Sequence, residues 1–206
     1  MTKAILLSVR PQHALNILYK TKTLELRKRI PKGFKGWVYV YVTKAKPFLN
    51  CWYGKCHLVY DYTYKELVDD NSIPLNGKVI ARFWFDEYDK YVDATNCYMT
   101  SCGMQCDNEY MYQLCELQDE IKNTCLTCDE IEAYGKGKDL YAWHIKKLEV
   151  LKPMQLSEFY VHSKDFYTAD KYDYENEELI NYVRVTKSPQ SFQYVYVEEN
   201  RNEIRI

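Results

Sequence analysis

The chain has 206 residues, a length that suits one domain or one domain with insertions. Apolar residues make up 47% and charged residues 28% of it. This composition excludes a disordered or collagen-like chain, and no window approaches the roughly 18 apolar residues of a membrane span. The opening MTKAILLSVRPQ has too short an apolar stretch for a signal peptide. We therefore expect a soluble, cytoplasmic protein that does not contact a membrane.

Charge is distributed unevenly along the chain, although the formal net charge is only −1. Residues 1–46 hold eleven Lys or Arg residues and one acid, Glu25, which gives this segment a net charge of +10. The remaining residues carry the balance of −11. One interpretation is a region that binds anions. The other is a solvated face whose charges pair with the later acids in the folded protein.

The first elements along the chain are a strand, a helix and a second strand. Ala4–Val9 is a short apolar run that predicts a buried strand, and Pro11 suits the first position of a helix ending near Tyr19. Thr21–Arg29 then alternates with period two. One predicted face carries Thr23, Glu25, Arg27 and Arg29, and the other carries Leu24, Leu26, Lys28 and Ile30. The polar face suits either the wall of a polar pocket or an exposed strand surface.

Four further segments have strand-like patterns: Trp37–Thr43, Lys78–Phe85, Leu140–Leu151 and Phe192–Val197. Residues 47–77 are rich in aromatic side chains and remain unassigned, apart from the turn signal Asn76-Gly77 at their end.

Two stretches are predicted to be insertions, at about 89–125 and 162–187. The first contains an amphipathic helix marked by Met111, Leu114, Leu117 and Ile121, and the second reads as a loop or helical excursion. Between them, Thr127 and Glu130 have the spacing of a capping box, which predicts a helix through Tyr134 that Gly135 ends. Strands dominate without regular βαβ alternation. We therefore predict one α+β domain over residues 1–206, a small mixed β-barrel with flanking short helices and helical insertions.

Metal binding has limited support in the spacing of the eight cysteines. Without a secretory signal they do not imply a disulfide framework. Cys125 and Cys128 form a CxxC pair, and Cys102 and Cys106 lie close enough in sequence to complete a zinc site. The alternative is a set of reduced cysteines in an insertion, and our prediction is that the protein carries no cofactor.

Lys22 is the candidate for lysine chemistry. It lies beside Arg27, and crowding together with partial desolvation would allow it to act as a base or nucleophile. The alternative is an ordinary charged lysine that contacts a phosphate or a carboxylate. The sequence has no GxSxG, HExxH or phosphate-binding glycine loop.

Tyrosine is unusually frequent, with 21 Tyr against 7 Phe. An AT-rich coding sequence would explain this excess. A tyrosine-lined binding surface would also explain it, because Tyr combines a flat stacking face with a polar tip.

The segment SVRPQHALNILYKTKTLELRKRIP resembles the signature of the ASCH domain, a PUA-like β-barrel family, in which a strand and a helix precede a Lys-Thr-x-Glu-x-Arg strand. WVYVYVTK, NGKVIARFWF and LYAWHIKKLEVLKPMQLSEF agree in order, and SPQSFQYVYVE resembles the end of ASCH-like proteins of phages and mobile elements. The resemblance implies a basic cleft for RNA or a modified nucleobase, in which cations position phosphate and an aromatic ring stacks a base. The implied ligand-binding residues are Arg10, Lys22, Thr23, Glu25, Arg27, Thr43, Lys44 and Trp143.

Three functions follow from these residues. The first is a non-catalytic module that binds RNA or a nucleotide-like ligand, as a regulatory or phage accessory protein. The second is a Lys-assisted amidohydrolase or nuclease with Lys22 and Glu25 as catalytic residues. Some small ASCH members use a Lys, a Thr three positions later and a distant Glu; here Glu25 stands at the Thr position, and Glu120 is a guess for the distant acid. The third is a protein-interaction factor that binds a host complex through the acidic, Tyr-rich stretch at 162–187.

Overall fold

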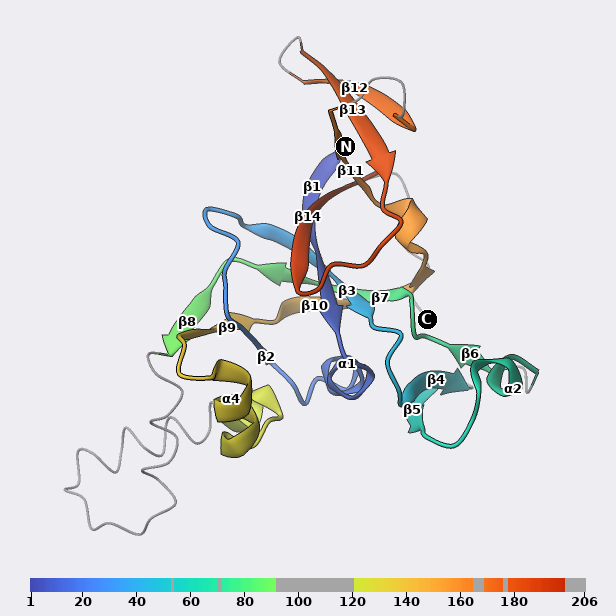
Figure 1. Cartoon of the computed structure of the whole chain (residues 1–206), viewed down its shortest axis with the longest axis vertical. Coiled ribbons are helices and arrows are strands. Elements are labelled where there is room, and N and C mark those ends of the chain that lie inside the picture. The colour runs from blue at the N-terminus through green and yellow to red at the C-terminus, as the bar shows by residue number, and fades with distance from the viewer. Residues whose placement is uncertain (53, 70–71, 92–120, 165–168, 176–177, 199–206) are drawn as a thin grey trace, which may run out of the picture. The chain divides into compact units, whose positions relative to one another are not determined.

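The structure is a computed structural model that describes residues 1–52, 54–69, 72–91, 121–164, 169–175 and 178–198. The chain forms two compact units, each built from separate stretches of sequence (Figure 1). Unit 1 comprises residues 1–18, 36–84 and 147–206, and unit 2 comprises residues 19–35 and 85–146. No helix in the described ranges has the length and apolar character needed to cross a membrane.

Most of unit 1 is an eight-stranded sheet in the order β10-β7-β3-β1-β14-β11-β13-β12. Its strands are β1 (Thr2–Val9), β3 (Gly36–Val42), β7 (Val79–Phe85), β10 (Lys146–Met154), β11 (Tyr160–Ser163), β12 (Lys171–Glu175), β13 (Glu178–Arg184) and β14 (Phe192–Val197). β1 pairs in parallel with β3 and antiparallel with β14. The strands predicted from the apolar runs at the two ends of the chain are therefore neighbours, as Figure 1 also shows.

The α+β class is confirmed, but the predicted barrel is wrong, because the described strands form three open sheets. The largest sheet ends at β10 on one side and at β12 on the other, so its ladder does not close. Two further predictions need correction. The single strand over Leu140–Leu151 is two strands, β9 (Leu140–His144) and β10, which belong to different sheets. Most of the described part of the stretch 162–187 is neither loop nor helix, since β11, β12 and β13 pair there as antiparallel strands.

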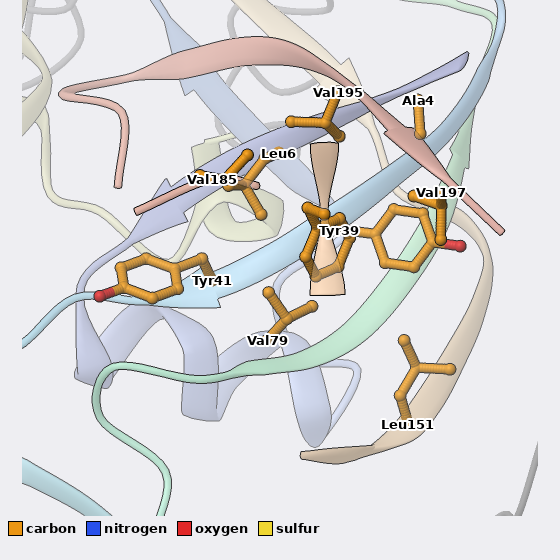
Figure 2. Close-up of a cluster of buried hydrophobic side chains, with 10 residues drawn as sticks. Ala4, Leu6, Tyr39, Tyr41, Val79, Leu151, Val185, Val195 and Val197 are labelled. Atoms are coloured by element: carbon orange, nitrogen blue, oxygen red, sulfur yellow. The ribbon is translucent and has the colours of Figure 1, made fainter. Parts of the chain in front are cut away.

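The core of unit 1 lies against β1, whose residues from Ala4 to Val9 are all buried. A strand buried on both faces reads as a continuous apolar run rather than an alternating one, which is the pattern of AILLSV. Figure 2 shows one side of this core, where Leu6, Tyr39, Val79 and Val195 gather from β1, β3, β7 and β14. The helix α1 (Pro11–Leu18) follows β1 and contacts β3 and two strands of the next sheet.

Residues 47–77, unassigned from sequence, form a small antiparallel sheet with a short helix. The sheet has the order β5-β4-β6, with β4 (Phe48–Trp52), β5 (Lys55–Val59) and β6 (Ile73–Pro74), and α2 (Tyr64–Asp69) lies between β5 and β6 in sequence. A disulfide joins the cross-strand pair Cys51 and Cys56. The chain leaves this sheet through the predicted turn, where Gly77 has a φ of 81°.

Unit 2 contains a three-stranded sheet in the order β2-β9-β8, with β2 (Leu24–Arg27) and β8 (Tyr88–Tyr91) at its edges. α4 (Cys128–Gly135) begins with the predicted capping box at Thr127, which is confirmed. The helix does not end through Gly135 as predicted, because the left-handed residue is Lys136, with a φ of 53°. Ile131 of α4 packs on Leu24 and Leu26, the apolar face of β2.

Candidate functional site

The opposite face of β2 carries a buried group of three charged side chains, which we call the β2 ion cluster: Lys22, Glu25 and Arg27. Oε1 of Glu25 lies 2.7 Å from Nη2 of Arg27, and Oε2 lies 3.4 Å from Nζ of Lys22. Nζ of Lys22 also donates a hydrogen bond to the carbonyl oxygen of Thr124. The single carboxylate of the segment 1–46 is therefore shared by two cations.

The alternation of β2 and the register of its neighbour position this cluster. Leu24 and Leu26 point to the apolar face, so Glu25 and Arg27 share the other face, as period two predicted. Glu25 pairs with Trp143 on β9, and Arg27 pairs with Tyr141. Sequence alternation therefore predicted which side chains share a face.

Burial distinguishes the observed cluster from the wall of an open pocket. Lys22, Glu25 and Arg27 are 2%, 6% and 9% exposed. A buried charge is tolerated when it is paired and hydrogen-bonded, and here Glu25 pairs with both cations while the Thr124 carbonyl accepts from Lys22. Trp143 is fully buried, and its ring lies 4.9 Å from that of Phe85. Lys22, Glu25 and Arg27 thus form an interior ion cluster in unit 2, and Trp143 is buried in the same unit. The predicted roles of all four in ligand binding or catalysis stay predictions.

Thr23 is the exposed member of the predicted motif strand. Its backbone is nonetheless fixed, because its amide donates to the carbonyl of Asn123 and its carbonyl accepts from the amide of Ile145. The side chain is therefore held at the surface of unit 2 by two backbone hydrogen bonds.

Arg10, Thr43 and Lys44, the other predicted binding residues, belong to unit 1. The amide of Thr43 donates to the carbonyl of Val9, which places the ends of β1 and β3 side by side. Arg10 and Lys44 are exposed. The stem of Lys44 lies over Gly77, where an added Cβ would meet its Cε at 3.1 Å. The structure thus brings these three residues to one end of the β1–β3 pair.

Of the four cysteines predicted as possible zinc ligands, two lie within the described residues. Cys125 and Cys128 are free thiols, and Sγ of Cys125 lies 3.3 Å from the carbonyl oxygen of Thr21. Cys102 and Cys106 lie outside the described residues. Across the ranges that the structure covers, no three His, Cys, Asp or Glu side chains gather as metal ligands. The zinc alternative stays a prediction.

Most cations of the segment 1–46 lie at the surface, in contrast to the β2 ion cluster. Eight of the eleven are exposed, and none of these eight forms an ion pair with an acid in the described part of the chain. We call them the surface cations: Lys3, Arg10, Lys44 and Lys46 in unit 1, and Lys20, Arg29, Lys32 and Lys35 in unit 2. The solvated-face interpretation expected later acids to neutralise them; among the described acids Glu66 interacts electrostatically with Lys46, and none of the eight forms an ion pair.

Unit 1 also has a pocket that the sequence analysis did not identify. Its volume is about 610 Å³, and it lies among β4, β5 and the segment that leads into α2. We call it the hairpin pocket, and the lining residues that matter below are Asn50, Trp52, His57, Tyr60, Asp61 and Tyr62. Two signals pointed to this region without locating a pocket, namely the tyrosine excess and the aromatic clustering in residues 47–77.

The hairpin pocket combines exposed rings with one buried polar group. Trp52 and Tyr60 are 56% and 63% exposed, far more than large apolar side chains in a core. Asn50 is 4% exposed, and its Oδ1 atom has no hydrogen-bond partner. Among the described lining residues there is no Lys or Arg. The pocket therefore offers flat apolar faces and acceptor atoms, and His57 is the described lining residue that can become cationic.

No protein-family model and no curated protein sequence matches the chain. Solved structures similar to it include ASCH from Zymomonas mobilis, with a TM-score of 0.44 and 15% identity over 74% of this chain and 73% of that one. Two single-residue variants of that protein match with TM-scores of 0.45, also at 15% identity; one match covers 75% of this chain and 77% of that one, and the other 74% of each. These structural neighbours are ASCH proteins, and membership of this chain in the family stays a prediction.

Proposed function

We propose that this protein binds RNA or another nucleotide-like anionic ligand through its surface cations. The observation that supports this proposal is the separation of charge within the first 46 residues. The one acid of the segment is buried between Lys22 and Arg27, while eight cations remain exposed without an ion pair in the described residues.

Exposed cations without neighbouring acids attract polyanions. A protein that binds a nucleic acid through Lys and Arg releases counterions from the phosphates, so its affinity falls steeply as salt is added. Four of the surface cations belong to each unit. The proposal therefore assigns phosphate contacts to the surface cations of each unit. An ASCH-type basic cleft lined by the motif from Lys22 to Arg27 stays a prediction from the resemblance, because Lys22, Glu25 and Arg27 are buried.

The β2 ion cluster has a supporting role in this proposal. Pairing Glu25 with two interior cations removes the only carboxylate that the segment has available to neutralise its surface cations. The exposed charged side chains of residues 1–46 are therefore all Lys or Arg.

The test is binding of a single-stranded RNA oligomer of mixed sequence, followed by fluorescence anisotropy over a series of salt concentrations. We expect the logarithm of the association constant to fall linearly with the logarithm of salt concentration, with a slope of about −0.7 for each phosphate contacted. Absence of binding at low salt, or binding without salt dependence, would contradict the proposal.

A further inference from the structure

We propose that the hairpin pocket of unit 1 binds a nucleobase that carries an exocyclic amino group, such as adenine or cytosine. This inference rests on the proposed function and adds a base-binding site to it. It depends on three observations. The pocket has exposed aromatic rings, its wall holds an acceptor atom without a partner, and none of its described lining residues is a Lys or Arg.

The exposed rings provide stacking faces. Trp52 lies on β4, and Tyr60 and Tyr62 lie in the segment between β5 and α2, so a strand and a neighbouring loop present aromatic side chains to the same pocket. Proteins that bind single-stranded nucleic acid stack unpaired bases on such side chains. The volume of about 610 Å³ falls within the range of roughly 300–1,000 Å³ that is typical of small-molecule sites.

Asn50 provides the polar recognition. A buried acceptor without a partner destabilises a folded protein, so each such atom calls for an explanation, and a ligand that completes the site is one. Asn76, in the turn that follows β6 of the same sheet, shows what a structural asparagine looks like. Its Oδ1 accepts from the amide of Leu49 at 2.7 Å, and its Nδ2 donates to the carbonyl of Ala45 at 2.8 Å. By contrast, Oδ1 of Asn50 accepts no hydrogen bond.

The chemistry of an amide matches an amino-bearing base. An asparagine side chain binds adenine by accepting from the amino group and donating to the adjacent ring nitrogen. Cytosine carries the same pair of groups side by side. Asp61 adds a further acceptor to the lining, and no described lining residue is a Lys or Arg. This lining favours an uncharged ring with N–H donors, while phosphates would bind at the surface cations.

The experiment measures binding of adenosine, cytidine and uridine to the full chain by NMR chemical-shift titration. The three nucleosides have no phosphate, so they report on the pocket alone. We expect adenosine and cytidine to bind about tenfold or more tightly than uridine, since uridine lacks the amino group. Equal binding of all three, or no binding of any, would overturn the inference.

Two variants locate the site. Asn50→Leu keeps the size of the side chain and removes the acceptor, so we expect a loss of nucleoside binding of at least tenfold without a decrease in Tm, because the free protein loses a polar atom that has no partner. Trp52→Leu should also reduce binding about tenfold or more, by removal of a stacking face. Tyr19→Leu is the matched control, because Tyr19 is 56% exposed and lies outside the pocket. Nucleoside binding that survives Asn50→Leu would overturn the inference.

The outcome separates this inference from the proposed function. If Asn50→Leu abolishes nucleoside binding while salt-dependent RNA binding remains, both stand. If RNA binds with salt dependence and no nucleoside binds, the inference fails and the proposed function stands. Saturation of the pocket by a trimethyl-lysine peptide instead of a nucleoside would also overturn the inference, because aromatic side chains with a carboxylate also recognise cations.

Discussion

Glu25 and Arg27 lie on the same face of β2, and Oε1 of Glu25 lies 2.7 Å from Nη2 of Arg27 in the interior of unit 2. Lys22 approaches the second oxygen of the same carboxylate. A single side chain thus compensates two buried cations. We therefore expect substitution of Glu25 to destabilise the protein more than substitution of either cation of the cluster.

Replacing Glu25 with Gln should destabilise the protein by about 3–5 kcal/mol, because Lys22 and Arg27 would stay buried without their shared counter-charge. Urea unfolding measures this difference. Glu132→Gln on α4 is the control, and we expect it to change the free energy of unfolding by less than about 0.5 kcal/mol. Equal effects of the two substitutions would show that the β2 ion cluster contributes nothing specific.

The capping box of α4 supports the other face of β2. The side chain of Thr127 accepts from the amide of Glu130, and the carboxylate of Glu130 accepts from the amide of Thr127 at 2.9 Å. Thr127→Ala should cost about 1 kcal/mol of stability, since it leaves a helix N–H group without its side-chain acceptor. Thr127→Asp should keep most of that stability, because Asp also caps helices. A loss from Asp as large as that from Ala would argue against the cap.

Glu66, in the first turn of α2, gives a pH-dependent prediction. The backbone amide of Thr63, and then its side chain, hydrogen-bond the carboxylate of Glu66 and hold its pKa below the ordinary value for glutamate. This stabilisation of the start of α2 is present above the ordinary glutamate pKa and is lost as the pH falls through the lowered pKa.

Carbon-detected NMR titration of the Glu66 carboxyl group measures this pKa directly. We expect a midpoint below that of an ordinary glutamate, and an upward shift in the Thr63→Ala variant, which lacks the hydroxyl group. A midpoint at or above the ordinary value would contradict the hydrogen bonds described at this helix start.

Much of the sheet could be predicted because short apolar runs end at Pro or Gly. β14 matches its predicted bounds, and β1, β3 and β7 differ from theirs by one or two residues at an end. Residues 140–151 were predicted as one strand because no Gly or Pro interrupts them. The break is at Ile145, and the left-handed residue nearby is Lys147, within β10, whose φ of 46° no sequence pattern indicates.

The candidate site was predictable only in part. Period two correctly placed Glu25 and Arg27 on one face of β2, but whether that face meets solvent or protein depends on packing that the strand itself does not encode. The hairpin pocket was not predicted, because residues 47–77 lack a clear period and because an unpartnered Oδ1 on Asn50 is a property of the folded chain alone. The barrel was wrong because strand patterns do not reveal whether a sheet closes.

The most direct test of the central claim compares RNA-binding salt slopes among charge-neutralised variants. One variant replaces the surface cations of unit 1 with Gln, and a second replaces those of unit 2. The control replaces four exposed lysines from outside the segment 1–46 with Gln, namely Lys138, Lys152, Lys164 and Lys187.

All three variants remove four positive charges, so a difference between them reports on position and not on net charge. If the surface cations bind phosphates, each of the first two variants should weaken RNA binding at low salt and flatten the slope by about 0.7 for every phosphate that the variant no longer binds. The control should keep the slope of the unmodified protein. A control whose affinity and slope fall as much as those of the other two variants would contradict the account.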